Sequence, residues 1–150
     1  MIIAIDFDGT CVTHEFPKVG KDIGAIPILR RLVKEGHNLI LWTMRSRKKE
    51  GNTEPGSLGW DNGNEIILET DVLQDAINWF DRNDILLYGI NNNPDQINWT
   101  NSPKAYAQLY IDDAALGCPT KFDKFLSDRE FVDWDRVKSE LIRIGVLSSE

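Results

Sequence analysis

Short apolar runs that alternate with amphipathic segments constrain the fold of this chain more than any other feature. Four runs have the length and composition of buried β-strands, and the segments with helical spacing of apolar residues lie between and after them. Strands that alternate with helices imply right-handed crossovers and a mainly parallel sheet, so the sequence predicts an α/β fold. The expected strands are 2–7, 38–43, 85–90 and 107–111, and the expected helices are 23–35, 71–82 and 133–144.

Polar side chains follow every predicted strand at the point where the strand ends. In a parallel sheet the carboxyl ends of the strands meet at one edge, where ligands bind near the topological switch point. We therefore expect a functional site at this edge. The residues that would meet there are Asp6, Asp8, Thr43, Arg45, 91–93, Asp112 and Asp113.

Four of these residues are carboxylates. Asp6 and Asp8 leave the first strand two residues apart, and Gly9 lets the backbone turn just beyond them. Side chains at i and i+2 of a strand share a face, so both carboxylates can point into one pocket with Asp112 and Asp113. These carboxylates would repel one another without a cation. A hard cation with oxygen ligands, Mg²⁺ above all, meets that need.

A metal-neutralised carboxylate can attack a phosphate ester. We expect Asp6 to attack phosphorus in line and to form a phospho-aspartate, which divides the reaction into two easier steps. Asp8 would protonate the leaving oxygen and then deprotonate the water that hydrolyses the intermediate. The residues thus predict phosphoryl transfer.

Three further side chains are candidates for substrate binding. Thr43 can donate its hydroxyl to a phosphoryl oxygen, and Lys104, in the loop before the fourth strand, can stabilise the remaining negative charge. Lys121 or Lys124 could take the place of Lys104. Arg45 could hold a second anionic group of the substrate, or could be an ordinary surface arginine.

The chain resembles the haloacid dehalogenase superfamily, most of whose members are phosphohydrolases. The first motif of that family, Asp-x-Asp-Gly-Thr, matches residues 6–10. The second, an apolar strand that ends in Thr or Ser, matches 39–43, and the fourth, an apolar strand that ends in an acidic pair, matches 109–113. The third motif is a lone lysine, for which Lys104 is the candidate.

The resemblance covers roughly residues 1–113 and implies a fold, a cofactor and roles. The implied fold is a Rossmann-like three-layer sandwich, and the implied cofactor is Mg²⁺. Asp6 would be nucleophile and ligand, and Asp8 would be the acid/base with its backbone carbonyl on the metal. Asp112 would be a direct ligand, and Asp113 would act through water.

One departure from the family concerns the cap domain. No segment is large enough to fold as a cap, so we expect residues 1–150 to form a single domain with a more open site. The long polar stretch 45–64, within a possible lid loop at 44–70, could cover the site, and Trp60 could contact substrate. Another subunit of a homo-oligomer could do the same. Residues 11–21 would form the short flap that follows the first strand in this superfamily.

The charge balance of the chain narrows the classes of partner that we expect. The sequence has 24 acidic and 17 basic side chains, a formal net charge of −7, which disfavours nucleic acid and anionic membranes as partners. A small phosphorylated metabolite, such as a nucleotide or sugar phosphate, is the expected substrate. Cys11 and Cys118 should be reduced, and His14 and His37 isolated and exposed. No apolar run approaches a membrane span and the N-terminus does not match a signal peptide, so a cytoplasmic protein is expected.

Other functions remain open at this point. A phosphotransferase or mutase would pass the phosphoryl group to a hydroxyl instead of to water. A signalling receiver domain uses similar residues, but there the acidic pair follows the first strand, and here the order is reversed. A protein that keeps this fold could also bind only phosphate or a partner.

Overall fold

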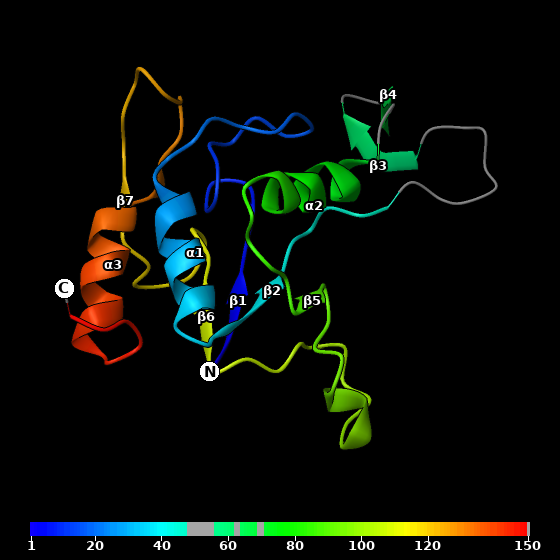
Figure 1. Ribbon diagram of the computed structural model, residues 1–150. Helices are drawn as coiled ribbons and strands as arrows, with labels where there is room; N and C mark the ends of the chain where they lie inside the picture. Colours follow the sequence, from blue (N-terminus) through cyan, green and yellow to red (C-terminus); the bar gives the residue numbers. More distant parts are fainter. Residues whose placement is uncertain (48–55, 62–63, 69–70, 150) are drawn as a thin grey trace.

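A parallel four-stranded sheet forms the centre of the computed structural model, which describes residues 1–47, 56–61, 64–68 and 71–149 (Figure 1). Within those ranges the strand order is β5-β2-β1-β6, and every neighbouring pair is parallel. The predicted α/β class with a parallel central sheet is thus confirmed. The strands are β1 (Ile2–Ile5), β2 (Asn38–Leu41), β5 (Gly89–Ile90) and β6 (Leu109–Ile111).

The three α-helices lie where periodicity predicts them. Asp71 and Asp133 cap two of them, because each side chain accepts a hydrogen bond from the backbone N–H three residues later. After the first helix, Gly36 has a φ of 92°, a conformation that glycine adopts at no steric cost. The helices are α1 (Ala25–Lys34), α2 (Val72–Arg82) and α3 (Trp134–Arg143).

The two faces of the sheet are covered differently. Ile3 and Ile5 belong to one buried core that also includes side chains from all three α-helices. On the opposite face, Ala4 is buried beside its register partner Tyr110. The Tyr110 hydroxyl donates to the carbonyl oxygen of Ala105, 2.5 Å away. The residues just before β6 thus pack beside Tyr110. The segment between β5 and β6 contains one regular element, the 3₁₀ helix η1 (Gln96–Asn98).

Backbone hydrogen bonds continue the sheet beyond the short strands. The Asp6 N–H donates to Ile111 at 3.0 Å, and the Trp42 N–H donates to Ile5 at 2.8 Å. The Asn91 N–H donates to Leu41 at 2.7 Å. These bonds hold the residues that follow β1, β2 and β5 in line at the carboxyl edge of the sheet.

Two antiparallel hairpins supplement the central sheet. One joins β7 (Thr120–Lys121) to β8 (Phe131–Val132), and the other joins β3 (Gly56–Asp61) to β4 (Asn64–Leu68). The second lies in the stretch that we expected to be a loop. The overlooked signal is the Asn-Gly pair in the sequence between β3 and β4, which is typical of a two-residue hairpin turn.

The predicted lid role of 44–70 stays a prediction, because residues 48–55, 62–63 and 69–70 and the Trp60 side chain lie outside the described part. Among the helices of the described residues, none is long and apolar enough to cross a membrane.

Candidate active site

Three aspartates meet at the carboxyl ends of β1 and its neighbour β6. Asp6 follows β1, and Asp112 and Asp113 follow the neighbouring strand β6. One carboxylate oxygen from each lies within 4.8 Å of those of the other two. All three side chains are partly buried. The sheet therefore assembles a compact acidic cluster from positions more than one hundred residues apart.

Thr10 connects the members of this cluster. Its fully buried hydroxyl donates to Asp6 Oδ2 at 2.8 Å and lies 3.3 Å from Asp113 Oδ1. The Thr10 oxygen also accepts the backbone N–H of Asp113 at 3.1 Å. Thr10 was not among the predicted site residues, although it is the last residue of the Asp-x-Asp-Gly-Thr motif.

Burial changes the acidity of Asp6. Desolvation is the main cause that raises its pKa to about 8, and the nearby Asp112 adds to the rise while the Thr10 hydrogen bond opposes it. Within the described residues, none of the three carboxylates forms an ion pair with a lysine or arginine. No lysine or arginine of the described residues thus compensates the charge of the cluster.

His14 lies against the cluster, so the prediction that it is isolated and exposed was wrong. Its Nε2 is 2.8 Å from Asp113 Oδ2, and its side chain is 14% exposed. A Cβ on Gly9 would lie 2.0 Å from the same nitrogen, and Gly9 has a φ of 79°. Glycine is therefore required at this turn both for the backbone conformation and for the approach of the imidazole. His37 is also partly buried, with Nε2 2.7 Å from the Val146 carbonyl oxygen.

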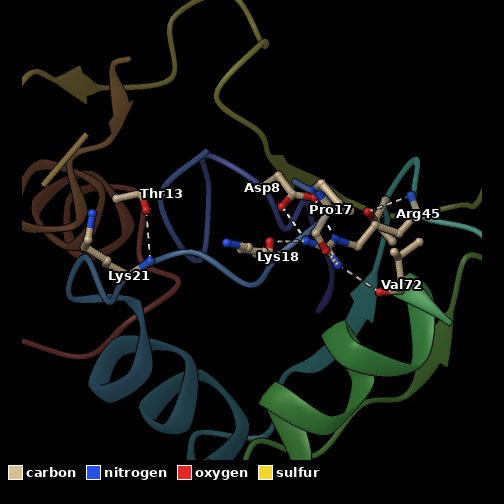
Figure 2. A network of polar contacts seen from close by, with 8 residues as sticks. Asp8, Thr13, Pro17, Lys18, Lys21, Arg45 and Val72 are labelled. Atoms are coloured by element: carbon tan, nitrogen blue, oxygen red, sulfur yellow. Dashed lines mark hydrogen bonds and ion pairs between the residues drawn. The ribbon is translucent and has the colours of Figure 1, made fainter. Parts of the chain in front are cut away.

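Asp8 lies in a different environment from Asp6. Arg45 donates to both of its carboxylate oxygens, from Nε to Oδ2 and from Nη2 to Oδ1, each at 2.8 Å (Figure 2). Arg45 is only 2% exposed. It is therefore not a surface arginine. Its guanidinium binds Asp8, whereas the other predicted role was to hold a second anionic group of the substrate.

Thr43 and Asn91 lie together where β2 and β5 end. The Thr43 N–H donates to Asn91 Oδ1 at 2.8 Å, and the Thr43 hydroxyl oxygen accepts the Arg45 N–H at 3.1 Å. Because that oxygen acts as an acceptor, its hydroxyl hydrogen can still be donated to a ligand. Asn91 has a φ of 52°, which Asn tolerates better than most residues.

The structure does not bring Lys104 to the acidic cluster. The segment between η1 and β6 passes beside the amino end of β1 (Figure 1), where Gln108 exchanges hydrogen bonds with Ile2. Lys104 is exposed, with its Nζ 5.8 Å from the Tyr110 ring centroid. The alternatives Lys121 and Lys124 are also exposed and make no ion pair with the cluster.

Both cysteines are free thiols, as predicted. Cys11 is buried beside the cluster, and its Sγ donates to the Asp6 carbonyl oxygen at 3.3 Å. Burial, with the charges of Asp6 and Asp8, raises the pKa of this thiol well above its ordinary value. Cys11 is therefore a packing residue of the first turn and not a thiolate.

Comparisons with known proteins support the fold and leave the activity open. Protein-family models give no match to the sequence, and the curated proteins give none either. A solved structure, described as a conserved protein from Bacteroides thetaiotaomicron, is similar over 96% of this chain and 90% of its own. The two share 28% sequence identity with a TM-score of 0.61. The chain therefore has the fold of that conserved protein, and its parallel sheet and aspartate cluster are compatible with the haloacid dehalogenase resemblance.

Proposed function

We propose that the protein is a magnesium-dependent phosphatase that acts on small phosphate monoesters through a phospho-aspartate on Asp6. The observation that carries the proposal is the cluster of Asp6, Asp112 and Asp113, which lies at the edge where parallel sheets bind ligands. Its negative charge has no lysine or arginine partner among the described residues.

The residues of the cluster fit a magnesium ion. Three carboxylates with oxygens within 4.8 Å of one another form a hard, anionic donor set, and the raised pKa of Asp6 reflects a charge that needs a cation. Asp6 and Asp112 would be direct ligands, Asp113 would act through water, and the Asp8 carbonyl would complete the set. When bound, the ion neutralises these carboxylates and the phosphoryl oxygens.

Asp6 and Asp8 divide the chemistry between them. A carboxylate oxygen of Asp6 forms a bond to phosphorus as the bond to the leaving oxygen breaks, and Asp8 gives its proton to that oxygen. In the second step Asp8 takes a proton from water, and the oxygen of this water attacks phosphorus. The bond between phosphorus and Asp6 then breaks, which releases phosphate and restores both carboxyl groups.

The neighbouring polar groups orient the reactants. Thr10 holds one oxygen of Asp6 and so turns the other toward phosphorus. Thr43 would donate its free hydroxyl hydrogen to a phosphoryl oxygen. Lys104 has no role in this proposal, because its Nζ lies beside the Tyr110 ring and makes no contact with the three aspartates.

A screen of phosphate release tests the proposal. The protein would be incubated with Mg²⁺ and a panel of nucleotide, sugar and polyol phosphates, with Asp6→Asn as the inactive variant and Asp135→Asn as a matched control. Asp135 is an exposed aspartate on α3, so its substitution should leave release unchanged. Release by Asp6→Asn equal to that by the unmodified protein would contradict the assignment of the nucleophile.

Chemical trapping provides a second test. Protein quenched with acid during turnover should carry covalent phosphate that hydroxylamine removes, as expected of an acyl phosphate, and Asp6→Asn should carry none. Turnover without any hydroxylamine-labile phosphate would favour direct attack by water.

A further inference from the structure

The ion pair between Asp8 and Arg45 has a geometry that fixes the carboxylate. Two parallel N–H···O bonds of 2.8 Å join the guanidinium fork to both oxygens of Asp8. A bidentate pair of this kind defines the plane of the carboxylate as well as its position. Both hydrogen bonds leave each oxygen with a further lone pair, so Asp8 can still exchange a proton with a reactant.

The remaining donors of Arg45 bind backbone carbonyls from two other segments. Nη1 donates to Val72 at the start of α2 at 2.9 Å, and Nη2 donates to Lys18 in the flap at 2.9 Å (Figure 2). A longer bond of 3.4 Å runs from Nη1 to the Pro17 carbonyl oxygen. With Asp8, these acceptors occupy all the N–H directions that the guanidinium offers, so no donor is left for a substrate.

Two aromatic rings and the end of β2 hold the arginine itself. Its Cζ lies 5.0 Å from the Phe7 ring centroid and 5.1 Å from that of Phe16, both within the range of cation–π attraction. The Arg45 backbone N–H donates to Thr43 Oγ1, and its carbonyl accepts from Asn91. A buried guanidinium with this many partners is costly to displace, because removal of one partner leaves an uncompensated charge.

We propose that Arg45 is the positioning residue of the acid/base: it holds the Asp8 carboxylate in the orientation that exchanges protons with the leaving oxygen, and it ties that orientation to the flap and to α2. This role rests on the proposed function. Arg45 touches neither substrate nor metal in this role, and its effect passes through Asp8.

The dependence of activity on the leaving group tests this role. An acid matters most when the leaving oxygen is strongly basic, as in glycerol phosphate, and least for 4-nitrophenyl phosphate, whose leaving group departs without a proton. Arg45→Lys keeps the charge and loses the fork. We expect it to lower kcat/KM for glycerol phosphate about 100-fold and for 4-nitrophenyl phosphate less than about 5-fold.

Two comparisons separate positioning from general damage. Arg136→Lys makes the same change at an exposed arginine on α3 and should leave kcat/KM for both esters unchanged. In an Asp8→Asn background, Arg45→Lys should lower kcat/KM for glycerol phosphate by less than a further factor of about three, because the group that Arg45 orients is already gone. A milder variant, Phe16→Leu, removes one of the two rings that hold Arg45 and keeps every hydrogen bond of the arginine. Because the Phe16 side chain is exposed, the fold should tolerate this change.

Equal losses on both esters, or a full additional loss in the Asp8→Asn background, would overturn the positioning role and leave the proposed function intact. If Arg45→Lys does not fold, Phe16→Leu decides: a loss confined to glycerol phosphate supports the role, and an equal loss on both esters refutes it. No phosphate release by the unmodified protein would overturn the proposed function, and this role with it.

Discussion

Asp6 and Asp8 are two residues apart in one turn, yet they lie in opposite electrostatic environments. Asp6 faces two other aspartates and a threonine hydroxyl, and burial raises its pKa to about 8. Asp8 faces a buried guanidinium that donates to both of its oxygens. Among the described residues the first carboxylate thus has no lysine or arginine partner, whereas the second has Arg45.

The difference shows how one turn can serve two chemical roles. A carboxylate that lacks a protein cation can take part in a metal site and reach an electrophile. A carboxylate in a bidentate pair is held in one orientation, which suits proton transfer to a fixed position. Neighbouring acidic residues can therefore be assigned to different roles from their partners, even where the sequence treats them alike.

Substitution of the nucleophile Asp6 should lower activity more than substitution of Asp8 or Thr10. Asp6→Asn removes the attacking oxygen, so we expect kcat to fall by at least about 10⁴-fold on every ester. Steady-state phosphate release measures the loss, with the exposed Asp135→Asn as reference. If the loss were large on alkyl esters and small on aryl esters, Asp6 would be behaving as an acid and the contrast with Asp8 would collapse.

Substitution of Asp8 should have a smaller and more selective effect. Asp8→Asn removes the proton donor but leaves the nucleophile, so kcat/KM should fall about 10²- to 10⁴-fold for alkyl phosphates. The loss for 4-nitrophenyl phosphate should be much smaller. Single-turnover measurements on both esters give the comparison, and an indifferent response to the leaving group would remove Asp8 from the first step.

Loss of the Thr10 hydroxyl should weaken the binding of Mg²⁺ by the aspartate cluster. Thr10→Val keeps the shape but leaves Asp6 and Asp113 without their shared hydrogen bond. We expect the affinity for Mg²⁺ to fall roughly 10- to 100-fold, as for other residues that orient metal ligands. Calorimetric titration of Mg²⁺ measures it. An unchanged affinity would show that the three carboxylates assemble without Thr10.

The last expected effect is on stability and not on catalysis: the free energy of unfolding of the metal-free protein should depend on pH. The pKa of Asp6 is raised from 3.8 to about 8, so between these values the folded state keeps a proton that the unfolded chain has lost. The resulting stabilisation is complete below about pH 3.8 and is lost as the pH rises through about 8.

Urea unfolding in the presence of a chelator measures this dependence. The free energy of unfolding should fall with rising pH in the unmodified protein, and Asp6→Asn should lack that component. Added Mg²⁺ should reverse the trend, because a cation favours the ionised carboxylate. If the difference in free energy of unfolding between the unmodified protein and Asp6→Asn did not change with pH, the pKa of Asp6 would be the same in the folded and unfolded states.

The sequence predicted much of the fold because the relevant signals are local. The helices were placed to within about two residues, since the spacing of apolar residues is read along the chain. The apolar runs of β1 and β2 are equally clear. The β3–β4 hairpin was missed although its Asn-Gly signal is also local, because the surrounding glycines and polar residues were interpreted as a loop.

The site was predictable only where strand order decides it. Asp6, Asp112 and Asp113 come together because two neighbouring parallel strands end at the same edge, and that follows from the α/β pattern. The two-residue periodicity that placed Asp8 with Asp6 does not extend to Asp8, because β1 ends at Ile5 and the chain turns.

By itself, the sequence determined the fold class and the acidic composition of one sheet edge, since both follow from local periodicity and from the order of motifs. Only the tertiary structure decided which partner each acidic residue has. Arg45 binds Asp8, His14 and Thr10 join the cluster, and Lys104 lies beside the Tyr110 ring. These outcomes depend on the paths of residues 11–21 and of the segment between β5 and β6. Such paths are set by long-range packing, which leaves no periodic signal in the chain.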